Sequence, residues 1–332
     1  MLVLPIVVLG YGAVSRAFIA QIISHRAEYR SRFDVDLYVA AVRTHRAQTE
    51  ITDDTIPPRP QWSAPTSLDD LIARVGARVV VQAVPSVDAD ADGAVADGVC
   101  ALRNGAHLVT ATKTTLLHGW CALDAVSRET GRAVKLSGTT GAMLPAADVA
   151  RSLRNGIHVT SVSGCVNGTA TFVLDRLSDG DSLGEAVEAA RRVGIAEGDP
   201  SADLSGRDVA MKIQILTGLL WGRDPGAAET ILEPITPAIR SAAVRAKGRG
   251  QRLRQVAVAD LDIPDLVTVS IRAVTRDSPL GALNGPEKAV IFDCGEFGPV
   301  TVTGGQSSPT GAAMAMIKDT LSLALETAPG LR

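Results

Sequence analysis

The feature that most constrains this chain is a glycine-rich turn directly after an apolar run at its N-terminus. Val3–Leu9 is almost continuously apolar, as in a parallel strand covered on both faces. It leads into Gly10-Tyr11-Gly12-Ala13-Val14-Ser15, and Ala13–Ser24 carries apolar residues at helical spacing. Between a strand and a helix, this G-x-G-x-x-G pattern with serine in third place is the dinucleotide fingerprint; the alternative is a glycine turn without a ligand. We predict that the cofactor contacts Gly10, Tyr11, Gly12, Ala13 and Val14.

Short β-branched runs alternate with helical patterns over the first part of the chain. The next expected strands are Val35–Val42, Arg78–Val84, His107–Ala111 and Ala133–Leu136. Helical patterns lie between them, and one, Cys121–Thr130, is closed by Gly131. This alternation predicts an α/β fold with a Rossmann-type doubly wound parallel sheet. Three further residues, where the third strand leaves the sheet, are assigned to the cofactor: Ala83, Val84 and Pro85.

The pattern changes after about residue 138, where helices come first and strands follow. Helices are expected over Met143–Leu153, two or three times within Thr169–Leu220, over Pro237–Lys247 and at the end over Gly311–Glu326. Strands are expected over Val159–Val166, Leu253–Val258, Val267–Val274 and Ala289–Phe292. This order predicts a second, α+β domain.

Composition excludes several classes of partner. The net charge is −3 and aromatic residues make up 3% of the 332 positions, so nothing favours nucleic acid or an anionic membrane. The N-terminal apolar run is too short to span a bilayer. Four scattered cysteines fit reduced thiols, which predicts a cytoplasmic protein.

The end of the second strand bears on the choice of cofactor. It reads Val42-Arg43-Thr44-His45-Arg46, without the carboxylate that usually binds the ribose hydroxyls of NAD. Arginine suits the 2′-phosphate of NADP through charge-assisted hydrogen bonds. We therefore favour NADP over NAD and assign Arg43 to the cofactor. The alternative is that Arg43 and Arg46 are solvated loop charges.

The second domain carries the most specific motif. Residues 196–208 read Ala-Glu-Gly-Asp-Pro-Ser-Ala-Asp-Leu-Ser-Gly-Arg-Asp, and Lys212 follows. This resembles the homoserine dehydrogenase pattern A-E-x-D-P-x-x-D-x-x-G-x-D-x-x-x-K. Three other segments resemble family motifs in the same order, so that the resemblance covers nearly the whole chain: Val109–Lys113 (V-T-A-N-K), Gly164–Thr169 (G-x-x-N-G-T) and Ser278–Leu280 (H-P-L).

The resemblance implies a domain plan and an activity. Residues 1–137 would form the dinucleotide-binding domain, completed by 305–332, and 138–304 a catalytic and dimerisation domain of a homodimer. The reaction would interconvert L-homoserine and L-aspartate 4-semialdehyde by hydride transfer with NAD(P). The substrate is thus a small amino acid.

The resemblance also implies residue roles. Lys113, Asp208 and Lys212 would be catalytic, with lysine as the acid/base for the substrate hydroxyl. Glu197 and Asp203 would hold the substrate's amino group. The remaining substrate-binding residues, near the nicotinamide, would be Asn167, Gly168 and Thr169.

Chemistry supports these roles and leaves alternatives open. Hydride transfer from an alcohol needs a group that takes the hydroxyl proton, and a partly buried lysine beside another cation can do so. No metal is required, and Ser137 replaces a glutamate that joins a monovalent-cation site in many relatives. Asp208 and Lys212 alone could form an ordinary solvated i,i+4 pair. Thr112, in place of the family's asparagine, leaves open a dehydrogenase for a homoserine analogue or a silent NADPH-binding protein.

Overall fold

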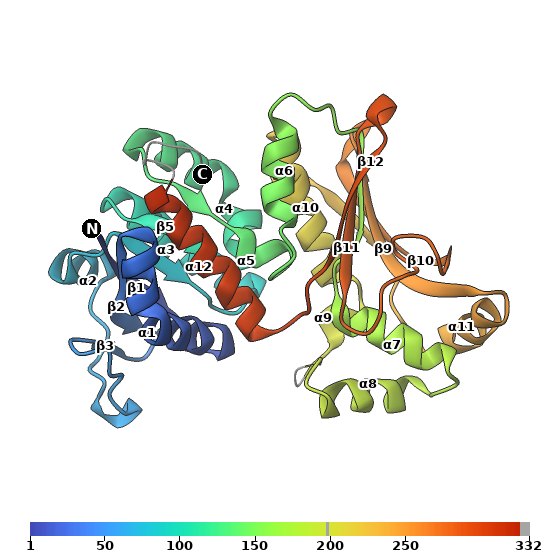
Figure 1. Cartoon of the computed structure of the whole chain (residues 1–332), viewed down its shortest axis with the longest axis horizontal. Coiled ribbons are helices and arrows are strands. Elements are labelled where there is room, and N and C mark those ends of the chain that lie inside the picture. The colour runs from blue at the N-terminus through green and yellow to red at the C-terminus, as the bar shows by residue number, and fades with distance from the viewer. Residues whose placement is uncertain (197–198, 326–332) are drawn as a thin grey trace. The chain divides into compact units, whose positions relative to one another are not determined.

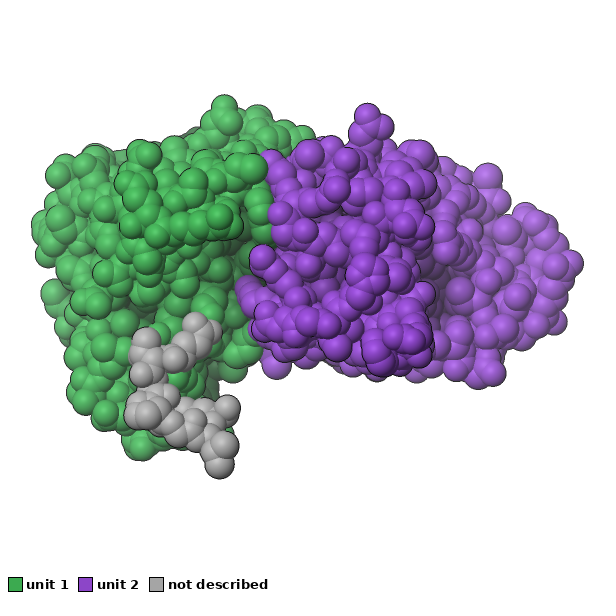
Figure 2. Space-filling model, turned by 90° about the horizontal axis from the view of Figure 1, so that it is seen from above, with its two compact units in different colours: residues 1–139, 312–332 green, residues 140–311 purple. Residues whose placement is uncertain are grey.

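The computed structural model describes residues 1–196 and 199–325. The chain divides into two compact units, shown in different colours in Figure 2. Unit 1 comprises Met1–Thr139 with Ala312–Arg332, and unit 2 comprises Thr140–Gly311. No helix among the described residues is long and apolar enough to cross a membrane.

Unit 1 is built on a six-stranded sheet with the order β3-β2-β1-β4-β5-β6. Its strands are β1 (Leu2–Leu9), β2 (Val35–Arg43), β3 (Gln48–Glu50), β4 (Val79–Gln82), β5 (His107–Thr110) and β6 (Val134–Lys135). The predicted Rossmann-type sheet is confirmed: β1, β2, β4, β5 and β6 pair in parallel. The edge strand β3 is an exception to the parallel pairing, because it runs antiparallel to β2. Only residues 44–47 join these two strands, too few for the crossover that a parallel pair needs.

Helices cover this sheet (Figure 1). They are α1 (Ala13–Phe33), α2 (Leu68–Val75), α3 (Ala91–Arg103), α4 (Lys113–Thr130) and the C-terminal α12 (Pro309–Leu325), with short turns η1 (Arg59–Gln61) and η2 (Asp88–Asp90). Helix α12 shares one core with β1 and α1, through Ala313, Met316 and Ile317. The prediction that α4 begins at Cys121 was wrong by two turns. Its first turns bury Thr114, Thr115 and Leu116, a tertiary contact that the sequence period does not show.

Unit 2 contains a second six-stranded sheet with the order β12-β11-β7-β9-β10-β8. Its strands are β7 (Ser161–Cys165), β8 (Glu229–Leu232), β9 (Gln251–Asp260), β10 (Ile263–Thr275), β11 (Lys288–Asp293) and β12 (Pro299–Gly304). All neighbours are antiparallel except β10 and β8. The predicted α+β character is confirmed, but β8 and β12 were missed. Both are edge strands with mostly exposed side chains, so no apolar pattern marks them.

The helices of unit 2 position the residues of interest. They are α6 (Ala146–Arg154), α7 (Gly168–Ser178), α8 (Leu183–Arg192), α9 (Ser201–Leu204), α10 (Arg207–Trp221) and α11 (Ile239–Gly248), with turns η3 (Pro225–Ala227) and η4 (Gly295–Phe297). The short α5 (Ser137–Thr140) lies at the unit boundary, and only its last residue belongs to unit 2. Helices α7, α8 and α11 share a core that includes Leu174, Ala186 and Ala243 (Figure 1). Helix α10 contacts β7, β9 and β10 and is buried over most of its length.

Candidate active site

A glycine fixes the start of the helix that carries the predicted acid/base pair. Gly206 has a φ of 85°, and a Cβ there would lie 2.8 Å from Val269 Cγ1. Only glycine adopts this left-handed conformation in so narrow a space. Helix α10 therefore begins at Arg207, which puts Asp208 in its first turn and Lys212 one turn later.

Asp208 and Lys212 form a shielded ion pair. Lys212 Nζ lies 2.6 Å from Asp208 Oδ2, and the two side chains are 13% and 14% exposed. The same Nζ donates a hydrogen bond of 2.8 Å to the backbone oxygen of Val166, just after β7. The pair is thus held against the end of a strand and is not an ordinary solvated helix pair.

Asn167 joins two carboxylates to the start of another helix. Its Nδ2 donates to Asp203 Oδ1 at 2.6 Å and to Asp208 Oδ2 at 2.7 Å. Its Oδ1 accepts the Ala170 N–H at 2.8 Å and so caps α7. An asparagine is needed here because the position calls for two donors and one acceptor at once.

Gly168 and Thr169, which follow Asn167 and were also predicted, pack against neighbouring segments. A Cβ at Gly168 would lie 2.8 Å from the backbone oxygen of Pro286, so this position admits glycine alone. Thr169 Oγ1 donates to the backbone oxygen of Ile195 at 3.2 Å. Glu197, predicted to bind the substrate's amino group, lies outside the described residues.

The two carboxylates make this place attractive to a cation. Burial raises the pKa of Asp203, and the nearby Asp208 carboxylate raises it further, while the bond from Asn167 opposes both effects. Both carboxylates meet at one amide group. Lys212 already pairs with Asp208, so a further ammonium group would bind beside Asp203 and relieve its repulsion from Asp208.

A buried lysine near this cluster was not predicted. Lys288, the first residue of β11, is 1% exposed, and its Nζ donates to the backbone oxygen of Gly141 at 2.7 Å. Burial and the Lys212 ammonium lower its pKa to about 7, against the opposing pull of Asp208. The only sequence signal is a lysine directly before the apolar run Ala289–Phe292.

In unit 1, the two fingerprint glycines have different tasks. Gly10 has a φ of 92°, and a Cβ there would lie 2.5 Å from the backbone oxygen of Ala83. Gly12 is the N-cap of α1, and a Cβ there would meet nothing within 4 Å. Ser15 is fully buried with its Oγ 3.4 Å from Ala83 O, so the third position accepts a small side chain. Gly10 shapes the turn, and Gly12 leaves space in front of it.

The start of α1 behind that space suits a phosphate group. The first turn of α1, with Ala13 and Val14, has no acidic residue and no side-chain cap, so its backbone N–H groups and the helix dipole favour a phosphate. Gly10, Tyr11 and Gly12 form the turn itself. These residues could hold the pyrophosphate of NAD(P).

The ends of β4 and β5 form the rest of the predicted cofactor surface. Thr112 Oγ1 accepts the Val84 N–H and donates to the Val84 oxygen, both at 3.1 Å. The hydroxyl thereby fixes the segment with Ala83 and Pro85. Lys113 opens α4, and its N–H donates to Ser86 Oγ at 2.9 Å. Lys113 belongs to unit 1, whereas Asp208 and Lys212 belong to unit 2.

Arginines surround the nucleotide turn. Arg43 Nη1 lies 3.7 Å from Asp97 Oδ1, and its Nε donates to the backbone oxygen of Thr66. The exposed Arg59, which was not predicted, stacks over the rings of Tyr11 and Trp62 at 5.1 and 4.4 Å from their centroids. The sequence does not indicate a role for Arg59, because the segment around it reaches the glycine turn only through tertiary packing.

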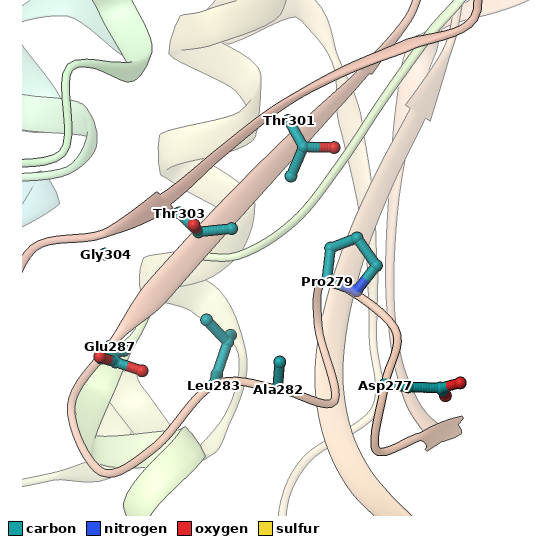
Figure 3. A pocket seen from close by; sticks show the side chains of 8 residues that line it. All are labelled: Asp277, Pro279, Ala282, Leu283, Glu287, Thr301, Thr303 and Gly304. Atoms are coloured by element: carbon teal, nitrogen blue, oxygen red, sulfur yellow. The ribbon is translucent and has the colours of Figure 1, made fainter.

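A separate pocket of about 420 Å³ lies in unit 2 (Figure 3). Pro279, from the segment that resembles H-P-L, lines it together with Leu283, Glu287 and Thr303. None of the predicted catalytic residues does, so we place no chemistry there. Among the described residues, no group of three or more His, Cys, Asp or Glu side chains is placed to hold a metal ion.

Comparisons with known proteins agree with the motifs. The homoserine dehydrogenase family model matches residues 145–321. The chain is 26% identical over 333 residues to the NAD(+)-dependent homoserine dehydrogenase of Pseudomonas canavaninivorans, covering 95% of this chain and 94% of that one. It is 25% identical over 337 residues to the homoserine dehydrogenase of Methanocaldococcus jannaschii, covering 96% and 98%. A hyperthermophilic archaeal homoserine dehydrogenase in complex with NADPH shares the fold, with a TM-score of 0.80 at 24% identity over all of both chains.

A dinucleotide turn in one unit and a shielded lysine–carboxylate cluster in the other define the class, an oxidoreductase that depends on a nicotinamide dinucleotide. The family model matches more than half of the chain. The chain therefore belongs to the homoserine dehydrogenase family, and its activity is the NAD(P)-dependent interconversion of L-homoserine and L-aspartate 4-semialdehyde. The predicted family, enzyme class and function are confirmed, and the two alternatives are not favoured.

Proposed function

We propose that Asp208 and Lys212 carry the proton transfer of this reaction. In homoserine oxidation, the Lys212 amine accepts the hydroxyl proton, and in aldehyde reduction its ammonium returns one. Asp208 orients this group and balances its charge. The observation that carries the proposal is the 2.6 Å pair, shielded from water and braced by Val166 and Asn167.

The carboxylates beside this pair suit the substrate's ammonium group. Asp203 and Asp208 converge on Asn167, and we propose that Asp203 binds the ammonium, together with Glu197. Asn167 positions both carboxylates, while Gly168 and Thr169 shape the turn. Their nearness to the nicotinamide, and the catalytic role of Lys113, remain predictions.

We propose NADP as the preferred cofactor. The end of β2 lacks a carboxylate, Arg43 ends this strand with Arg46 three residues later, and Arg59 stacks over Tyr11 of the turn, which together suit a 2′-phosphate. When bound, the nicotinamide supplies or accepts the hydride. Arg43→Ala should raise the KM for NADP by about tenfold and leave that for NAD nearly unchanged, as expected for one lost charge-assisted bond. Equal effects on both cofactors would contradict the assignment.

The acid/base assignment is tested by two lysine variants. Lys212→Met should lower kcat for homoserine oxidation by about 100- to 1000-fold, as for loss of an acid/base group, and leave NADPH binding intact. Lys247 is a matched control, since it forms a 2.7 Å ion pair with Asp179 in the same unit but is 44% exposed. Lys247→Met should keep normal turnover. Near-normal turnover of Lys212→Met, or a wild-type protein inactive on homoserine with either cofactor, would contradict the proposal.

We propose that unit 1 is the dinucleotide-binding domain and unit 2 the catalytic and dimerisation domain of a cytoplasmic homodimer. The free cysteines fit a reducing compartment. The edge strand β8 supports dimerisation, because its Ile231 is 59% exposed. Light scattering at micromolar concentration should give twice the mass of 34.5 kDa, and Ile231→Arg should shift it toward one chain. A monomeric wild type would refute the dimer.

A further inference from the structure

Lys288 is a buried lysine to which the proposed reaction gives no role. It is 1% exposed, and its Nζ donates to the neutral backbone oxygen of Gly141 at 2.7 Å. Keeping an ammonium charged in such a place is costly, whereas a methionine would fill similar space without that cost. The position therefore calls for a reason beyond packing.

Strand pairing places Lys288 beside the acid/base pair. Strand β11 runs antiparallel to β7, with Ala289 opposite Cys165. Lys288 is the residue before Ala289 on β11, and Val166 directly follows Cys165 at the end of β7. The Val166 oxygen is the one that accepts a hydrogen bond from Lys212.

A second contact ties the same segment to the cluster. Pro286, two residues before Lys288, lies so close to Gly168 that an added Cβ would be 2.8 Å from the Pro286 oxygen. Gly168 directly follows Asn167, which bonds both carboxylates. A shift of the start of β11 would therefore reach the residues that orient the pair.

Most surroundings of Lys288 carry no charge. Residues 140–145 offer a backbone carbonyl but no ionisable side chain, and the partner on β12 is Gly304. The Cys165 thiol on β7 stays neutral, because burial raises its pKa to about 12. Glu287 is engaged with the backbone N–H of Asn284 at 2.8 Å.

The charged groups that act on Lys288 both come from α10. The Lys212 ammonium repels its positive charge, and the Asp208 carboxylate attracts it. Burial and repulsion outweigh attraction, so the pKa of Lys288 falls to about 7. Lys288 thus changes charge near neutral pH beside the pair.

We propose that Lys288 is a positioning residue for the proton transfer: it holds the Gly141 carbonyl and decides whether a second positive charge stands beside Asp208 and Lys212. The inference rests on the roles proposed for those two residues. Homoserine oxidation delivers a proton to the pair, so an uncharged Lys288 favours it. Aldehyde reduction removes that proton, so a charged Lys288 favours it.

The pH profile of homoserine oxidation tests the proposal. We would measure kcat/KM from pH 5.5 to 9 for the wild type, Lys288→Met and Lys288→Arg. Each pH unit below the pKa lowers the uncharged fraction of Lys288 about tenfold. The ratio of wild type to Lys288→Met should therefore fall by up to about tenfold per unit below pH 7 and stay constant above it. Lys288→Arg, always charged, should be slow throughout and lack this bend.

Either result decides the matter. A ratio that stays constant from pH 5.5 to 9 would overturn the proposal, even if both variants melt at lower temperature. A merely structural role of Lys288 would change the stability of the protein but would not make this ratio depend on pH. Melting curves and NADPH binding verify that each variant is folded.

A readout without turnover separates this inference from the proposed function. The chain has six lysines, so ¹³Cε labelling of the wild type gives few signals to follow by NMR. One signal with a midpoint near pH 7, absent in Lys288→Met, supports the change of charge proposed for Lys288 whether or not the roles of Asp208 and Lys212 hold, and the bend in the rate ratio then tests its effect on the pair. If every lysine signal in the wild type has its midpoint above pH 9, the proposal is wrong.

Discussion

Replacing Lys288 by methionine should change how the stability of unit 2 depends on pH. Burial and Lys212 lower the pKa of Lys288 from 10.5 in a free lysine to about 7. Between these two values the unfolded chain holds a proton that the folded chain lacks. Because stability rises with pH wherever the unfolded state binds more protons, the wild type gains stability as the pH increases over this window.

The magnitude follows from the size of the shift. One bound proton changes the free energy of unfolding by about 1.4 kcal/mol per pH unit, so the full window is worth roughly 5 kcal/mol. Over the convenient range from pH 7 to 9.5, the wild type should gain about 3 kcal/mol relative to Lys288→Met. Below pH 7 the methionine variant has its greatest advantage, because it buries no charge.

Urea unfolding at several pH values measures this difference. Trp221, on α10, reports on unit 2 when Trp62 and Trp120 are replaced by phenylalanine in both proteins. Lys288→Arg is the control, since a permanently charged side chain should give no gain over this range. If the difference between wild type and Lys288→Met does not change from pH 7 to 9.5, Lys288 keeps its proton in the fold and the reasoning is wrong.

Three further substitutions test other parts of the structure. Gly12→Ala should leave the melting temperature almost unchanged but weaken NADP binding at least tenfold by titration calorimetry, because its Cβ enters only the open space in front of α1. Gly10→Ala should instead destabilise the fold. The reverse pattern would contradict the roles given to these two glycines. Asp36→Asn should cost about 2 kcal/mol at pH 7 in urea unfolding, since two arginines hold the pKa of this carboxyl well below its usual range. That loss should shrink as the pH falls below about 4, where the unfolded carboxyl takes up a proton; a loss independent of pH would refute the ion-pair account. Arg254→Met should cost about 3 kcal/mol, because the fully buried guanidinium serves three backbone oxygens and a carboxylate, and a loss under 1 kcal/mol would show that water replaces it.

Local features were readable from the sequence because their causes are local. The turn from β1 to α1 follows from glycines at fixed spacing. The cap of α2 has an equally local cause, since the Asp70 N–H donates to the Ser67 side chain three residues earlier. The strand ends and helix starts were less accurate where burial, and not the period, sets the boundary, as at Lys113 in α4.

The motif that resembles the family identified most residues of the site but did not predict their geometry. Spacing alone put Asp208 and Lys212 one helical turn apart, and it could not distinguish a solvated pair from a shielded one. The distinction came from Val166 and Asn167, which reach the pair from a strand end 41 to 46 residues earlier.

By itself, the sequence determined the dinucleotide turn, the α/β and α+β character of the two parts, and the residue types of an acid/base site. Only the tertiary structure decided that Lys288 lies buried against Gly141, 147 residues away, and that Arg59 stacks on Tyr11. The physical reason is that periodicity and spacing act within a few turns of the chain. Contacts between distant segments depend instead on sheet register and packing, which no short pattern encodes.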